Sequence, residues 1–170
     1  KVPVMDAGLE VLESLETMAH RMNLAITVSD PHLEQVDANG EYTGGLGVAP
    51  GTCLTRIRRV MCADTRPVAY LIDTLPEDVL KLQDLPEGFT GSVLDFLLGH
   101  GHDLRISRAA ITATNATAEV AKALEIQRGD VLLQFVSQLY TAEGRIVDHT
   151  VSYFIPGYFN FHVVRRIGSS

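Results

Sequence analysis

The chain repeats one pattern of residues about 78 positions apart, and this duplication constrains its fold more than any other feature. In the first copy, Ala38 is followed by Leu46 after eight residues and by Gly51 after five more. The second copy begins at Ala116 and has its leucine and glycine at the same two spacings. Solenoid repeats have shorter units, of roughly 20–50 residues. The pattern therefore indicates one domain built from two related halves, and we expect a binding site between them.

Each half is expected to contain a short helix followed by an antiparallel hairpin. Alternating strand patterns around turn residues predict the hairpins within residues 54–73 and 131–154. Apolar residues at three- and four-residue steps predict another helix over residues 6–22, with Asp6 as its N-cap. A further short helix is expected over residues 93–98. The fold class is therefore α+β, with a single antiparallel β-sheet flanked by helices.

Composition limits the partners of this chain. Its 170 residues, 46% of them hydrophobic, suit one globular domain. A net charge of −7 argues against direct DNA binding, because phosphate contacts need a basic surface. No apolar run reaches the roughly 18 residues of a membrane span. The two cysteines, Cys53 and Cys62, are expected to be free thiols of a cytoplasmic protein and not a disulfide. Neither a metal nor a cofactor is expected, since a helix C-cap explains His100 and His102 better than metal binding does.

Two features could hold an anion. Arg56 and Arg58 lie two residues apart in a predicted strand, so their guanidinium groups share a face and could clamp a carboxylate or phosphate. The alternative is an exposed, salt-bridged sheet face in which Asp73 or Asp148 neutralises them. Ser92 opens a predicted helix, whose free N–H groups attract anions, although a serine there can also act only as an N-cap.

Several short motifs follow one another in a defined order from about Leu9 to Arg166. They are Leu46-Gly47-Val48-x-x-Gly51, Arg56-x-Arg58, Pro67-Val68, Leu75-Pro76, Gly91-Ser92-Val93-Leu94, the segment from Ala116 to Leu124, and Tyr153-Phe154-x-x-Gly157-x-Phe159-x-Phe161-His162-Val163-x-Arg165. In order and spacing they resemble the UTRA domain. That domain is the effector-sensing part of GntR-type bacterial transcription regulators of the HutC subfamily.

The resemblance implies a fold similar to chorismate lyase, with a buried small-molecule pocket. Residues 1–170 would form the effector-binding domain of a cytoplasmic regulator, and this domain would pair as a homodimer. DNA would be bound only through an N-terminal winged helix-turn-helix module that is absent from this chain. A small anionic metabolite would modulate that binding, and the sequence leaves open whether it weakens or strengthens it.

The resemblance also assigns candidate effector-binding residues. It places Arg56, Arg58 and Ser92 at the anionic group of the effector. Asp148 falls on the acidic residue of the second hairpin, and Thr27, expected in the loop after the first helix, falls near positions that contact ligand in relatives.

Two positions depart from the family pattern. Leu71 falls where the family has an acidic pocket residue, and Phe154 falls where it has a tyrosine. Both changes remove a group that could bind a hydroxyl, so the pocket is expected to favour an anion less hydroxylated than a sugar phosphate. We expect an anion-holding end and an apolar end formed partly by these two residues.

Two other functions fit the same residues. A stand-alone enzyme of the chorismate lyase type would share the fold and would need an acid or base, for which Asp148 is the only obvious candidate. A dimerisation module with a vestigial pocket is the third possibility. An in-frame helix-turn-helix upstream of Lys1 would distinguish the regulator from the enzyme.

Overall fold

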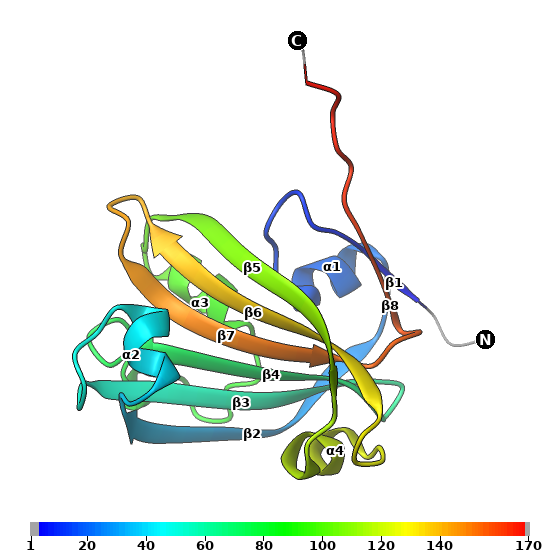
Figure 1. Cartoon of the computed structure of the whole chain (residues 1–170), viewed down its shortest axis with the longest axis horizontal. Coiled ribbons are helices and arrows are strands. Elements are labelled where there is room, and N and C mark those ends of the chain that lie inside the picture. The colour runs from blue at the N-terminus through cyan, green and yellow to red at the C-terminus, as the bar shows by residue number, and fades with distance from the viewer. Residues whose placement is uncertain (1–3, 169–170) are drawn as a thin grey trace.

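The computed structural model describes residues 4–168, which form a six-stranded antiparallel sheet, a two-stranded parallel sheet and helices around them (Figure 1). The strand order of the large sheet is β2-β3-β4-β7-β6-β5, so the β4–β7 pair joins the two halves. This confirms the expected α+β fold with one large antiparallel sheet. The elements are β1 (Met5–Gly8), α1 (Leu15–Arg21), β2 (Ile26–Asp37), α2 (Glu41–Leu46), β3 (Cys53–Ala63), β4 (Arg66–Pro76), the 3-10 helix η1 (Leu82–Asp84), α3 (Val93–Gly99), β5 (Leu104–Asn115), α4 (Ala118–Leu124), β6 (Val131–Thr141), β7 (Ile146–Phe154) and β8 (Phe159–His162).

The duplicated residues make the same backbone hydrogen bonds in both halves. The N–H of Ala38 donates to the carbonyl of Thr52 at 2.8 Å, and the carbonyl of Ala38 accepts from the N–H of Gly51 at 2.9 Å. The same two bonds recur around Ala116, also at 2.8 and 2.9 Å. Gly51 has φ +80°, a conformation that favours glycine. The repeat is therefore a helix followed by a hairpin, α2-β3-β4 and α4-β6-β7, as the sequence predicted.

The duplication also includes the two remaining α-helices. Ser14 is the N-cap of α1 and accepts a hydrogen bond from the N–H of Thr17, and Ser92 caps α3 by accepting from the N–H of Asp95. The two serines are 78 positions apart, the same period as Ala38 and Ala116. The hydroxyl of Ser14 also donates to Asp95 Oδ2 at 2.7 Å, so the starts of the two related helices are directly linked.

The helix predicted over residues 6–22 is wrong in its first part. Residues 6–8 belong to strand β1, which pairs in parallel with β8, and residues 9–14 are irregular. Helix α1 begins only after Ser14, not at Asp6. Met5 and Ala7 alternate into the interior with 4% and 0% exposure, as strand residues do. Pairing with a strand at the other end of the chain overrides the local helical periodicity.

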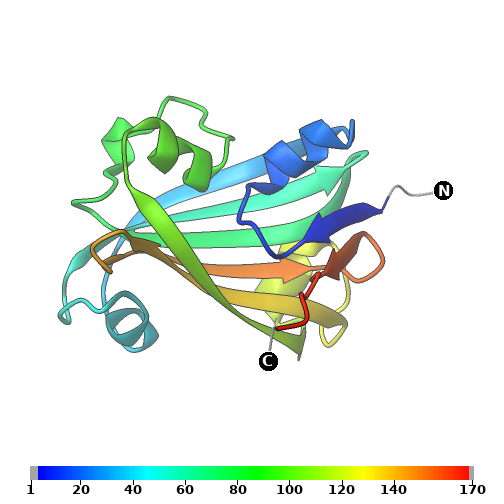
Figure 2. The ribbon, with the colours of Figure 1, turned by 90° about the horizontal axis from the view of Figure 1, so that it is seen from above.

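Helices cover both faces of the large sheet. Figure 2 shows α1 and α3 on one face, called here the α1/α3 face, and α2 and α4 on the other, the α2/α4 face. Ile57 of β3 is fully buried on the α1/α3 face, in one core cluster with Val93 and Leu97 of α3. Tyr70 of β4 lies on the α2/α4 face in a cluster with Leu124 of α4. Within residues 4–168, no helix has the length and apolar character needed to cross a membrane.

Candidate functional site

A cavity of about 590 Å³ lies between the α1/α3 face of the sheet and the segments that cover it. Residues 8–16 form one wall and the start of α3 forms another. Five neighbouring strands of the large sheet, β3, β4, β7, β6 and the edge strand β5, form the floor. This volume falls within the roughly 300–1,000 Å³ typical of small-molecule sites.

Cross-strand pairing sets which side chains meet on the floor of the cavity. Residues that lie opposite each other on neighbouring strands project their side chains to the same face of the sheet. The strand pairing therefore places the floor residues in two adjacent rows. The first row is Arg59, Leu71, Ser152 and Phe135, and the second is Asp73, Thr150 and Ser137. The floor therefore mixes charged groups, hydroxyls and apolar side chains.

Arg59 supplies the buried positive charge of the cavity. It is 5% exposed, and its Nη1 donates to Glu16 Oε1 at 2.5 Å and to the carbonyl of Gly91 at 2.6 Å. These contacts join β3 to α1 and to the residue preceding the α3 cap. Among the residues described, Nε of Arg59 has no hydrogen-bond partner.

Asp73 and Asp148 form a buried carboxyl pair beside Arg59. They are 5% and 4% exposed, and their carboxyl groups are close enough to interact and to share a proton. Burial raises the pKa of Asp73. Burial, followed by the charge of Asp73, raises the pKa of Asp148 well above its usual value. The pair therefore titrates as a unit and retains a proton at a pH where a solvated aspartate has lost it.

Apolar side chains form the other end of the cavity. The rings of Phe154 and Phe135 lie 4.8 Å and 4.7 Å, centroid to centroid, from the ring of Phe161. Leu71 lies beside them on the floor. On the covering wall, Leu9 and Val11 are 39% and 76% exposed. Leu71 and Phe154 therefore lie in the apolar part of the cavity lining, and their contact with an effector stays a prediction.

Four of the seven sequence-predicted site residues line the cavity: Leu71, Ser92, Asp148 and Phe154. Thr27 lies within β2, not in a loop, where it is exposed and pairs opposite Cys62. The lining of this cavity does not include Thr27, Arg56 or Arg58.

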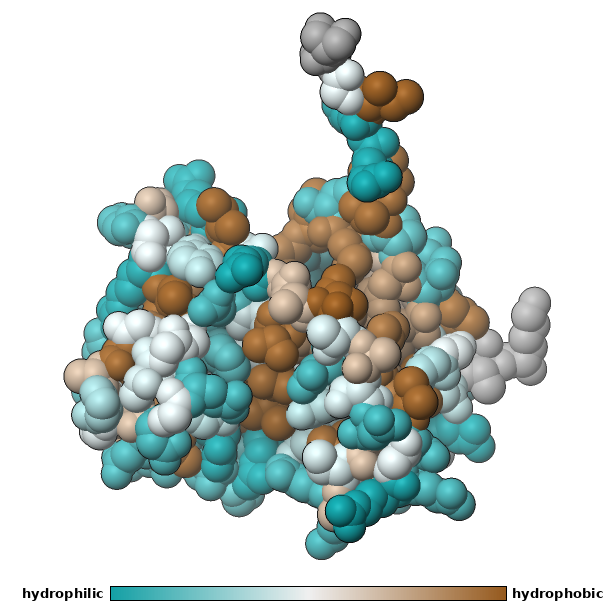
Figure 3. Space-filling view, in the orientation of Figure 1, coloured by the Kyte–Doolittle hydropathy of each residue, from teal (hydrophilic) through white to brown (hydrophobic). Residues whose placement is uncertain are grey.

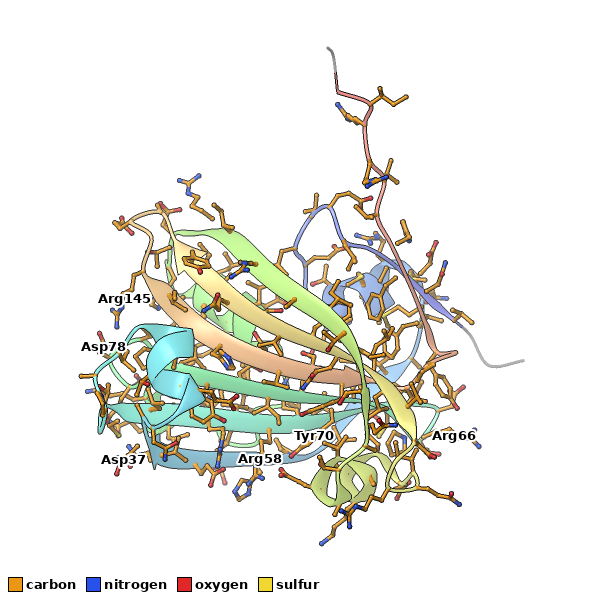
Figure 4. All side chains as sticks on the ribbon, in the orientation of Figure 1. Asp37, Arg58, Arg66, Tyr70, Asp78 and Arg145 are labelled. Carbon is orange, nitrogen blue, oxygen red and sulfur yellow. The ribbon has the colours of Figure 1, made fainter. Side chains whose placement is uncertain are left out.

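The expectation that Arg56 and Arg58 share one space with Ser92 is wrong in geometry. Both arginines project from the α2/α4 face, because residues of a strand alternate between faces. Arg56 Nη2 lies 2.7 Å from Glu34 Oε1 on β2, and Arg58 Nη1 lies 3.2 Å from Glu119 Oε1 on α4. Figure 4 shows Arg58 next to Tyr70, beside α4. Their ion-pair partners are Glu34 and Glu119, not Asp73 or Asp148, and a role for the two arginines in effector binding stays a prediction.

Sequence reasoning missed Arg59 and Asp73, although strand alternation carried a signal for both. Ile57 is the one apolar residue in the segment Arg56-Ile57-Arg58-Arg59, so the strand face that carries Ile57 is expected to point to the protein interior. Arg59 lies two positions further and must share that face. Asp73 is paired directly with Ile57 across the hairpin.

The family model of the UTRA domain matches residues 22–160 of this chain. An uncharacterized HTH-type transcriptional regulator of Rhizobium meliloti (strain 1021) is 31% identical over 118 residues, which cover 68% of this chain and 48% of that protein. The chain thus spans about half the length of this curated relative.

Solved structures show the same fold. The effector domain of PhnF from Mycobacterium smegmatis superimposes with a TM-score of 0.86 at 16% identity, covering 95% of this chain and 99% of that domain. A putative transcriptional regulator from Streptomyces coelicolor superimposes with a TM-score of 0.71 at 26% identity, covering 84% and 95%. With the family model matching most of the described residues, the chain belongs to the UTRA domain family and has the fold of the effector domains of GntR-family transcription regulators.

Proposed function

We propose that this chain is the effector-sensing and dimerisation domain of a GntR-type regulator of the HutC subfamily, acting in the bacterial cytoplasm. A small metabolite binds in the cavity and modulates DNA binding by a separate N-terminal helix-turn-helix domain. One observation carries the proposal, namely a ligand-sized cavity with charged, hydroxyl and apolar groups in a fold shared with effector domains. The HTH-type relative supports the link to transcription.

The metabolite carries an anionic group, and Arg59 is the cavity residue suited to hold it. Its guanidinium is buried, and the Nε–H is free of hydrogen-bond partners within residues 4–168. Glu16, Asp73 and Asp148 already surround this arginine. A singly charged carboxylate therefore fits better than a phosphate dianion, because each further negative charge meets carboxylates in a poorly solvated site.

The covering wall supplies a route from the cavity to a DNA-binding domain. Residues 9–13 line the cavity and follow directly after β1, the first described strand. The wall is tied to the end of the chain by Glu10, whose side chain accepts a hydrogen bond from the N–H of Val164. A ligand that holds this wall in one position biases the position of β1. Effector and operator are then coupled reciprocally, so each changes the affinity for the other by the same factor.

Dimerisation involves the α2/α4 face, where the sheet between the two helices is not fully covered. Figure 3 shows apolar residues gathered over the middle of this side of the molecule. One cross-strand row there is apolar and partly exposed, and a second copy of the chain would cover it: Ile72, Val151, Val136 and Ala110. A two-fold dimer suits palindromic operators. Light scattering should give about twice 18.6 kDa, and the monomer mass at high micromolar concentration would refute a dimer.

A thermal-shift screen of carboxylates, phosphates and amino-acid catabolites tests the cavity as the effector site. A ligand at about 100 times its Kd should stabilise the domain by roughly 2.7 kcal/mol. Ala109→Trp should abolish the shift, because Ala109 lies on the cavity floor. Ala113→Trp is the matched control, since Ala113 is exposed on the same strand and its side chain is not part of the cavity lining.

The outcomes separate the candidate functions. A ligand that shifts both tryptophan variants as it shifts the wild type binds outside the cavity, and the proposal fails. The alternative enzyme of the chorismate lyase type predicts that the ligand is converted during incubation. A regulator domain should return it unchanged, which mass spectrometry of the incubated ligand can establish.

A further inference from the structure

The polar end of the cavity carries more negative than positive charge. Four charged groups meet there from four elements: Glu16 from α1, Arg59 from β3, Asp73 from β4 and Asp148 from β7. Arg59 and Glu16 neutralise each other at 2.5 Å. If the carboxyl pair keeps one proton, one negative charge remains at this end. Arg105 of β5 also lines the cavity, but its side chain is 64% exposed and its charge is paired with Asp103 at 2.8 Å.

This negative charge lies in the wall of the cavity. Asp148 is 4% exposed and lines the cavity, yet its Oδ1 atom has no hydrogen-bond partner within the described residues. A buried carboxylate oxygen without a partner is destabilising, commonly by about the energy of the missing hydrogen bond. Thr150 is paired with Asp73 across the sheet and Ser137 with Thr150, so hydroxyl oxygens border the same space.

We propose that the Asp73–Asp148 pair binds a positively charged nitrogen of the effector, so that the effector is an amino-acid-like zwitterion. The inference rests on the proposed function and deepens it. The Oδ1 atom of Asp148 is buried in the cavity wall, and a rotation of this side chain brings it to the ligand, where the ammonium group donates to it and to the neighbouring hydroxyl of Thr150. The carboxylate pairs with the guanidinium of Arg59, whose buried Nε–H has no described partner, and the remaining apolar side chain of the effector lies toward Leu71 and Phe154.

Charge balance supports a zwitterion over a simple anion. A simple anion would add a second negative charge to a site that already has one in excess. A zwitterion leaves the total unchanged and places each of its charges beside the opposite one. In a poorly solvated cavity such complementarity decides which ligand binds, because like charges brought together there are strongly unfavourable.

The experiment uses matched ligand triads, each with an amino acid, its deamino acid and its decarboxylated amine. Phenylalanine, 3-phenylpropanoate and 2-phenylethylamine form one such triad, and leucine, 4-methylpentanoate and 3-methylbutylamine form another. In at least one triad the amino acid should bind about 10–100-fold more tightly than its deamino acid, the effect of one charged hydrogen bond. Asp148→Asn should abolish this preference. Asp78→Asn should leave it intact, because Asp78 pairs with Arg145 in the region near α2, away from the cavity lining (Figure 4).

The remaining outcomes overturn the inference in distinguishable ways. If nitrogen-free carboxylates or phosphates from the wider screen bind in the cavity and no triad shows an amino preference, the inference is wrong and the proposed function stands. If nothing binds in the cavity, both fail. Should Asp148→Asn not fold, Asp73→Asn replaces it, and the triad comparison on the wild-type domain already decides the ligand class.

Discussion

Replacing Arg59 should destabilise the fold much more than replacing the adjacent Arg58. Arg59→Met removes the buried cation but keeps most of the apolar stem, so packing changes little. Glu16 and the Asp73–Asp148 pair then lack a positive neighbour. Removing one partner of a buried ion pair costs about 3–5 kcal/mol, and we expect about 3 kcal/mol because Glu16 is 24% exposed. Arg58→Met is the control, because Arg58 is 26% exposed and its loss should cost below about 1 kcal/mol.

Thermal unfolding and urea titration measure this difference. For a domain of this size, 1 kcal/mol lowers the melting temperature by about 2–4 °C, so Arg59→Met should lose roughly 6–12 °C. The loss should shrink as pH falls from 8 to 5, because the uncompensated carboxyl groups can then take up protons. Equal melting temperatures for the two variants, or a loss at Arg59 that does not depend on pH, would refute the reasoning.

Three further predictions concern α2, the carboxyl pair and the apolar end. Gly45→Ala should lower the free energy of unfolding by about 1–3 kcal/mol, because a Cβ there would lie 2.6 Å from His149 Cδ2. Gly44→Ala is the control, because its added Cβ meets no atom of another segment within 4 Å. It should be neutral or stabilising by up to about 1 kcal/mol in urea unfolding. The wild type should lose stability as pH rises above about 3.9, because burial raises the pKa of Asp148 and the folded state then binds a proton that the unfolded state has lost. Asp148→Asn should flatten this decline. An unchanged dependence of stability on pH in the variant would contradict the prediction. Phe154→Tyr should shift the ligand preference in the thermal-shift screen toward hydroxylated compounds, because the ring lines the cavity. The melting temperature without ligand should change little. If the preference stays the same, the ring does not contact the ligand.

The sequence contained enough information for the sheet, because its determinants are local. Alternation within each strand and the turn glycines at Gly51 and Gly129 lie within a few residues of the elements they specify. The start of the chain could not be predicted in this way. Residues 9–13 are apolar at helical spacing, yet they form a cavity wall because β1 pairs with β8, a contact that spans almost the whole chain.

The candidate site was predicted only in part for a related reason. Leu71, Asp148 and Phe154 were found because a family pattern fixed their place in the chain. The choice between Arg58 and Arg59 depends on which strand face is turned to the interior, and a shift of one residue reverses it. Asp73 was considered only as a salt-bridge partner on the sheet surface. Its role in a buried carboxyl pair depends on the β4–β7 pairing, which joins the two halves.

The matching serine caps at Ser14 and Ser92 have a consequence for how a ligand is oriented. Together with the antiparallel pairing of β4 and β7, the equivalent strands of the two halves, they indicate that the cavity lies between the halves. A site made only of equivalent residues would then accept a ligand equally well in two reversed poses. The chain breaks this equivalence within the cavity. The counterpart of Arg59, 78 positions later, is Ser137, and the counterpart of Glu16 is Leu94. If the proposed ligand binds there, these unequal pairs should favour one pose over the reversed pose, because only one half of the cavity then offers the buried arginine.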